Sequence, residues 1–138
     1  MRYRYCPLCG KKLIMKEAGD DGLVPYCVSC KKYWFDAFSD VVMVLTYNEY
    51  DEIVLTKAGY MSDTYCSFTT GYITPGETSE ETAVREVKEE LGLDLETLEY
   101  NGTVWFETAE MLMHTYIGFT HKKDLKLSEE LDWGEAVL

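Results

Sequence analysis

The chain has little positive charge. Thirteen Lys and Arg residues stand against 25 Asp and Glu residues, which gives the 138-residue chain a net charge of −12 at pH 7. This balance argues against non-specific binding to nucleic acid, because the phosphates would be repelled. It does not argue against a nucleotide that arrives with metal ions. We therefore expect no direct nucleic-acid partner.

Long apolar runs are also missing. No run reaches the roughly 20 residues that a helix needs to cross a bilayer, and the start, MRYRYCPLCG, has no signal-peptide pattern. We expect a soluble, cytoplasmic protein with no membrane partner. The sequence has no internal repeat or low-complexity tract, and its length allows one proper core with a small appendage.

Histidine occurs only twice, as His114 and His121. Each stands alone in or after a predicted strand. Packing or exposure to solvent explains such isolated residues better than catalysis does.

Cysteine, in contrast, is concentrated near the N-terminus. Cys6 and Cys9 form one CxxC pair, Cys27 and Cys30 form another, and seventeen residues separate the pairs. Two residues between the thiols let both sulfurs of a pair reach one tetrahedral ion, so the spacing predicts a structural four-cysteine Zn²⁺ site on two small hairpins. A redox dithiol is the alternative, but such sites use one CxxC near a βαβ pattern.

The composition changes near residue 40. Residues 1–40 carry seven basic and five acidic side chains, whereas the remainder carries six and twenty. Gly, Pro and Ser are sparse at this boundary, so we expect no flexible linker. We predict a zinc ribbon at residues 1–38 and a second domain at residues 39–138.

The second domain is predicted to be mostly β. Residues 41–45 form a near-continuous apolar run, which is typical of a buried central strand. The other predicted strands are residues 53–55, 97–106 and 111–120, with a short last segment at 136–138 and a loop at 57–64. Together with one helix, they indicate an α+β fold.

That helix lies within residues 71–93, GYITPGETSEETAVREVKEELGL. Thr78 and Glu81 fit a capping box, so the helix should begin near Thr78 or Ser79. Gly92 is a natural stop, because glycine adopts the left-handed conformation without strain.

The helix has an apolar side and an acidic side. Ala83, Val84, Val87 and Leu91 are predicted to lie on the core side. Glu86, Glu89 and Glu90 are predicted to gather on the opposite side, at i, i+3, i+4 spacing. Like charges so close repel unless a cation lies among them, and Mg²⁺ prefers oxygen ligands. A solvated acidic face is the alternative.

The same stretch matches a known pattern at each of its specified positions. These are Gly71, Glu77, Arg85-Glu86-Val87, Glu89-Glu90 and Gly92-Leu93. From about Asp40 onwards, the chain therefore resembles the Nudix hydrolase family. The resemblance implies an α/β/α sandwich with a mixed sheet. Because the chain stops where the family's C-terminal helix should begin, we expect a shortened member or a truncated chain.

The resemblance also implies a reaction. Nudix hydrolases cleave a diphosphate that links a nucleoside to another group, by attack of water on phosphorus. By position, Glu86, Glu89 and Glu90 would hold Mg²⁺ or Mn²⁺. Arg85 would orient a glutamate of the matched pattern, and Glu77 would close the loop against the helix. Gly71 and Gly76 would let the loop backbone turn tightly.

A ribbon in front of a Nudix domain is similar to the arrangement in NADH pyrophosphatases. Of the motif that those enzymes carry after the matched pattern, only Trp105-Phe106 is present here. The carboxylate that they place near the end of the following strand is absent, and Phe119 and Thr120 stand there instead. We expect a small-molecule substrate of the nucleoside diphosphate type, with NADH, NAD or ADP-ribose ahead of triphosphates. Trp105 and Phe106 are candidates to stack on it, although they could instead fill the core. A homodimer is compatible with this interpretation.

Two further alternatives concern the chemistry. Glu107 and Glu110 lie in a turn between strands and could supply an accessory carboxylate, or they could be solvated loop acids. The whole chain could also be a non-catalytic nucleotide-binding or regulatory module. Three clustered glutamates favour the enzyme, because a binding module does not need them.

Overall fold

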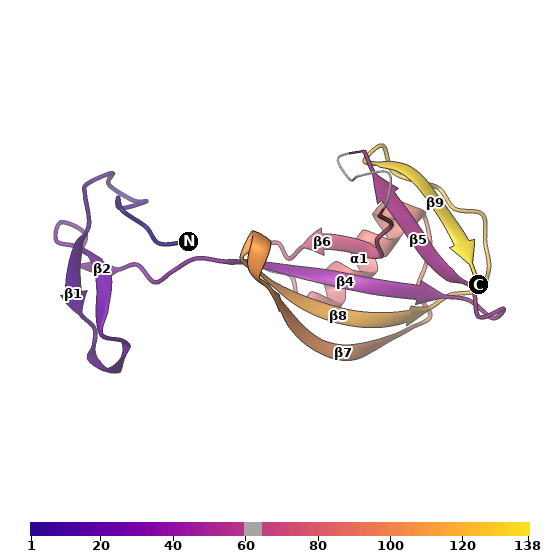
Figure 1. The fold of residues 1–138 in the computed structure, drawn as a ribbon, viewed down its shortest axis with the longest axis horizontal. Coiled ribbons are helices and arrows are strands. Elements are labelled where there is room, and N and C mark those ends of the chain that lie inside the picture. The colour runs from indigo at the N-terminus through magenta and orange to yellow at the C-terminus, as the bar shows by residue number, and fades with distance from the viewer. Residues whose placement is uncertain (60–64) are drawn as a thin grey trace. The chain divides into compact units, whose positions relative to one another are not determined.

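The computed structural model describes residues 1–59 and 65–138. These form two compact units, Met1–Phe38 and Ser39–Leu138, which we describe separately (Figure 1). The predicted loop at residues 57–64 lies largely outside the described residues. No helix among the described residues is long and apolar enough to cross a membrane.

The first unit is a small antiparallel sheet. Its strands are β1 (Ile14–Glu17), β2 (Leu23–Cys27) and β3 (Lys32–Tyr33), in the order β1-β2-β3. A short 3-10 helix, η1 (Gly19–Asp21), connects β1 to β2. Cys6 and Cys27 are buried.

The second unit is a mixed sheet with one α-helix among the described residues (Figure 1). Its elements are β4 (Ser39–Tyr47), β5 (Ile53–Ala58), β6 (Thr69–Tyr72), α1 (Ser79–Leu91), β7 (Thr97–Phe106), η2 (Glu107–Ala109), β8 (Met111–Phe119) and β9 (Leu131–Val137). The strand order is β7-β8-β4-β5-β9, and β6 pairs with β4. The β4–β8 pair is parallel, and the other pairs are antiparallel. The predicted mixed sheet with a central apolar strand is confirmed.

The last strand is longer than predicted. β9 begins at Leu131 and pairs with β5 as far as Val137. Gly134 interrupts the apolar pattern of this segment, which weakens the strand signal in the sequence. In the structure a Cβ at Gly134 would lie 2.8 Å from Leu127 Cδ2, so the glycine lets Leu127, from the segment before β9, pack closely against the strand.

The ends of α1 agree with the prediction. Thr78 Oγ1 accepts a hydrogen bond from the Glu81 amide, and Glu81 Oε2 accepts one from the Thr78 amide. Gly92 is left-handed at φ 69°, and its amide donates to the carbonyl of Lys88.

The predicted division of α1 into two opposite sides is wrong. The buried side contains Ala83, Val87 and Leu91, but Val84 is 46% exposed. Glu86 and Glu90 point towards the sheet instead of away from it, because residues three, four and seven apart share one helical side. A Cβ at Gly71 of β6 would lie 2.0 Å from the Glu86 carboxyl carbon, which shows how closely helix and strand approach.

The core joins this helix to the middle of the sheet. Its buried members are Val42, Val44, Val54, Ala83, Val87, Leu91, Leu93 and Tyr116. The helix is therefore held by apolar packing on one flank, while its glutamates lie against the end of β6. This packing determines where the acidic side chains gather.

Replacement of Leu91 by alanine should be costly, because its side chain is fully buried. We expect Leu91→Ala to lower the free energy of unfolding by about 2–5 kcal/mol. Val84→Ala, on the same helix, should change it by no more than about 0.5 kcal/mol. Urea denaturation of both variants measures the difference, and equal losses would contradict the described orientation of α1.

Candidate functional site

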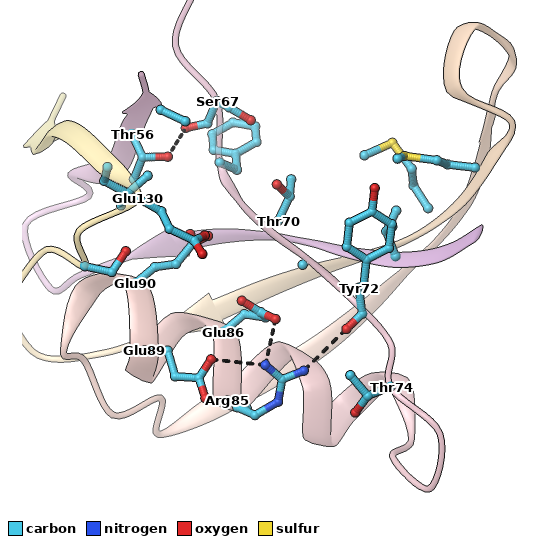
Figure 2. A pocket seen from close by; sticks show the side chains of 18 of the residues that line it. Thr56, Ser67, Thr70, Tyr72, Thr74, Arg85, Glu86, Glu89, Glu90 and Glu130 are labelled. Atoms are coloured by element: carbon cyan, nitrogen blue, oxygen red, sulfur yellow. Dashed lines mark hydrogen bonds and ion pairs between the residues drawn. The ribbon is translucent and has the colours of Figure 1, made fainter. Parts of the chain in front are cut away.

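A pocket of about 790 Å³ lies in the second unit. Its acidic lining residues lie on α1 and in the segment before β9, and its uncharged lining residues lie mainly on strands β4 to β8. Figure 2 shows Arg85, Glu86 and Glu89 projecting from the helix towards the strand that carries Tyr72. The segment that matches the family pattern therefore forms a wall of this pocket.

Glu77 and Arg85 clamp the loop before α1 onto the helix. Arg85 Nε donates to Glu77 Oε1 at 2.7 Å, and Nη2 donates to Oε2 at 2.9 Å. Thr74 and Thr82 hydroxyls also donate to Glu77 Oε2. These hydrogen bonds, chiefly those from Arg85, lower the pKa of Glu77 to about 2. Glu77 is thus a fixed anion that shapes the loop.

Arg85 also contacts the other carboxylates. Its Nη1 donates to Glu86 Oε1 at 2.7 Å and to Glu89 Oε2 at 3.1 Å. Its Nη2 donates to the carbonyl of Tyr72 at 3.3 Å. Hydrogen bonding to Glu77, followed by that to Glu86, raises the pKa of Arg85. All three guanidinium nitrogens are therefore engaged.

Glu86 lies against Gly71. Its side chain is 14% exposed, and burial raises its pKa. The expectation that Gly71 provides a tight turn is wrong, because Gly71 lies within β6 and has no positive φ. A side chain at this position would instead occupy the space of the Glu86 carboxylate. Gly76 does adopt a positive φ of 97°, in the loop before the helix.

Glu90 is the most perturbed carboxyl group of the cluster. Burial, and then the negative charges of Glu86 and Glu130, raise its pKa to about 7. Glu89, in contrast, has a side chain that is 58% exposed. A buried group with like-charged neighbours gains a proton or binds a cation. The donor set consists of carboxylate oxygens, which are the kind of ligand that a hard divalent ion prefers.

Glu130 belongs to this cluster, although the sequence reasoning missed it. It lines the pocket together with its neighbour Glu129, and Figure 2 shows it beside Glu90. Two backbone hydrogen bonds tie its loop to the end of α1: the Ser128 amide donates to the Glu90 carbonyl at 3.0 Å, and the Lys126 amide donates to the Leu91 carbonyl at 2.8 Å. The adjacent acids just before a strand were the available signal, but the start of that strand was not recognised.

The predicted binding residues separate in the structure. Phe106 lines the pocket, whereas Trp105 is not among the described residues that line it. Successive strand residues face opposite sides of a sheet, and Trp105 Nε1 donates to Glu107. Glu107 and Glu110 are likewise not among the described lining residues. Among the described lining residues, the carboxylates from outside α1 are Glu129 and Glu130.

The histidines lie outside the pocket lining. His114 Nε2 is 3.1 Å from Asp40 Oδ1, and His121 Nε2 is 3.3 Å from Glu96 Oε1. Neither residue is among the described residues that line the pocket. Both are therefore paired with carboxylates elsewhere on the second unit.

The four N-terminal cysteines cluster, as predicted. Their sulfur atoms all lie within 4.8 Å of one another. Cys6 Sγ is 3.9 Å from Cys30 Sγ, and Cys9 Sγ is 3.6 Å from Cys27 Sγ. Four thiolates around a tetrahedral Zn²⁺ are separated by about 3.8 Å. The cluster thus fits such an ion.

Comparison with known proteins agrees with these observations. The family model of the NUDIX domain matches residues 37–136. An "NAD-capped RNA hydrolase" of Schizosaccharomyces pombe is 29% identical over 93% of this chain and 39% of its own length. An "NAD-capped RNA hydrolase NudC" of Pseudomonas aeruginosa is 31% identical over 72% of this chain and 34% of its own. The chain thus spans less than half the length of either relative.

Solved structures show the same fold. A NUDIX hydrolase from Nitrosomonas europaea superposes with a TM-score of 0.75 at 16% identity, covering 97% of this chain and 77% of that one. The NUDIX domain of Shewanella oneidensis NrtR, in complex with ADP ribose, gives a TM-score of 0.65 at 14% identity and covers 81% of this chain and 77% of that one.

The raised pKa of Glu90 predicts how stability depends on pH. Its pKa in the folded state is about 7, against 4.5 for the ordinary group, so the folded protein holds this proton more tightly. The free energy of unfolding of metal-free protein should therefore fall, by on the order of 2 kcal/mol, as the pH rises from about 5 to about 8. Denaturation in EDTA across this range measures the slope.

Two variants test whether Glu90 causes this pH dependence of the free energy of unfolding. Glu90→Gln should remove most of it, because the amide does not ionise. Glu99→Gln, an exposed position on β7, should retain it. Retention of the slope in Glu90→Gln would show that another group is responsible.

Proposed function

Because the chain belongs to the NUDIX family, we propose that it is a hydrolase that cleaves a nucleoside diphosphate linked to another group, with Mg²⁺ or Mn²⁺. One observation carries this proposal: Glu86, Glu89, Glu90 and Glu130 converge on one pocket. Arg85 is the only Lys or Arg among the described lining residues, and it is fully engaged. A polyanionic substrate would be repelled from this pocket unless metal ions accompany it.

The side chains of the cluster would have different roles in holding those ions. Arg85 orients Glu86 and Glu89 through charge-assisted hydrogen bonds. Gly71 leaves room for Glu86, and Glu90, whose pKa is raised to about 7, would lose its proton to hold a cation near neutral pH. A bound Mg²⁺ or Mn²⁺ would neutralise the diphosphate and lower the pKa of a water molecule. Glu77 shapes the loop and binds no metal in this scheme.

Glu130 is our candidate for the accessory carboxylate. It lines the pocket, and its negative charge raises the pKa of both Glu86 and Glu90. As an exposed carboxylate on a loop clipped to the helix, it can accept a proton from the attacking water or add an oxygen ligand. Either role needs a carboxylate outside the helix, which Phe119 and Thr120 do not provide.

The aromatic residues of the pocket are an argument for a dinucleotide-like substrate. Tyr72 and Phe106 line the uncharged part of the pocket, and their rings could stack on a base or a nicotinamide. Two relatives are named for NAD-capped RNA, and one structural neighbour contains ADP ribose. These ligands share an adenosine diphosphate attached to a second ribose. We therefore place NADH, NAD and ADP-ribose ahead of nucleoside triphosphates.

We further propose that residues 1–38 are a structural zinc ribbon and that residues 39–138 are the Nudix domain. Cys6, Cys9, Cys27 and Cys30 would fill all four positions of the ion and leave none open for chemistry. The ion would then stabilise a unit whose apolar core is small.

Activity should require an added divalent cation. With NADH and Mg²⁺, we expect turnover, and EDTA should abolish it. Glu89→Gln, Glu90→Gln and Glu130→Gln should each lower kcat on the order of 100-fold, because each removes a charge from the cluster. Glu99→Gln is the matched control and should be unaffected. Full turnover in EDTA would reject the metal-dependent reaction, whereas no turnover with either Mg²⁺ or Mn²⁺ would leave a non-catalytic nucleotide-binding module as the better interpretation.

Zinc should be present at about one ion per chain, because one four-cysteine cluster is formed. Elemental analysis of protein purified without chelator measures it. Cys6→Ser should lose the ion and unfold the first unit, yet retain part of the hydrolase activity, since the carboxylates lie in the second unit. Protein without zinc, but with the first unit folded, would contradict this assignment.

A further inference from the structure

The two ends of the pocket differ in charge. At one end lie Glu86, Glu89, Glu90, Glu129 and Glu130. The single guanidinium, Arg85, is bound to three carboxylates and one carbonyl. The described lining residues therefore include no cation that is free to bind a phosphate.

The other end is a neutral wall built by strand register. Val41 of β4 lies between Tyr72 of β6 and Met113 of β8, because Val41 is paired with both. Further along, Met111 of β8 is paired with Phe106 of β7. These five side chains line the pocket and carry no charge. The wall suits a ring and a ribose, but it offers no ion pair.

A diphosphate can enter this pocket because its charges are matched by metal ions at the acidic end. A further phosphate on the group that occupies the neutral wall would have no such partner. It would lose hydration on entering the pocket and would be repelled by the nearby carboxylates. Its binding would cost free energy without any compensating contact.

We infer that this pocket selects diphosphates whose attached groups carry no additional phosphate. The inference rests on the proposed function and adds a charge limit to its substrate class. NAD, NADH and ADP-ribose meet the limit. A dinucleotide with a 2′-phosphate on its adenosine does not. Met111 and Met113 are then specificity-determining residues, since a cation at either position would supply the missing partner.

NADH and NADPH provide the test, because they differ by one phosphate. With wild-type protein and fixed Mg²⁺, kcat/KM for NADPH should be at least tenfold lower than for NADH. The difference should lie mainly in KM, because the additional phosphate is far from the diphosphate that is cleaved and affects binding of the substrate. It should shrink as salt is added, since the repulsion is electrostatic.

Two variants test the cause. Met113→Lys and Met111→Lys should each reduce the preference for NADH at least threefold. Met113→Gln, which is neutral and of similar size, should leave the preference unchanged. Circular dichroism and thermal unfolding establish which variants are folded, and the two positions provide independent chances of a folded lysine variant.

Specific results would overturn the inference. Equal kcat/KM values for NADH and NADPH would do so even if both are hydrolysed, and the proposed function would then stand. A folded lysine variant with an unchanged preference would also refute the assigned cause. If neither dinucleotide is hydrolysed, the proposed function fails instead. The intrinsic fluorescence of the reduced nicotinamide then compares their binding directly, and equal affinities would overturn the charge limit.

Discussion

The salt bridge between Arg85 and Glu77 is the interaction on which the site depends. It has two hydrogen bonds, and it joins the loop before α1 to the middle of the helix. Because the same guanidinium contacts Glu86, Glu89 and the Tyr72 carbonyl, it also fixes the helix against β6. One cation thus holds together a loop, a helix and a strand in a region that would otherwise be dominated by repulsion between acids.

In this arrangement, favourable apolar packing is accompanied by unfavourable burial of charge. The core requires Ala83, Val87 and Leu91 to face the sheet, and this orientation carries Glu86 and Glu90 into partly buried surroundings. A solvated acidic face would be more stable in the absence of metal. The raised pKa of Glu90 is a measure of the unfavourable charge that the fold retains, and a bound cation would relieve it.

Features that depend on residues close together in the sequence were predictable. In the first unit, the cysteines of each pair are near neighbours, so their spacing alone predicts the cluster that the structure contains. The capping box of Thr78 and Glu81 and the left-handed Gly92 were predictable for the same reason. The central strand was also evident, because a continuous apolar run leaves few alternatives.

Features that depend on distant residues were not predictable. Helical periodicity gave the relative angles of the side chains, but only packing against β4 and β6 established that Val84 is exposed and Glu86 is partly buried. Glu130, a carboxylate of the pocket from outside the helix, lies 40 residues after Glu90 in the chain. Its loop reaches the helix because backbone amides of that loop donate to the carbonyls of Glu90 and Leu91. The separation of Phe106 from Trp105 likewise follows from the side of β7 that faces the pocket. The sequence by itself determined the local chemistry, namely the thiolate pairs, the helix ends and the glutamate spacing. The tertiary structure alone decided which glutamates share a pocket, because that depends on contacts between segments far apart in the chain.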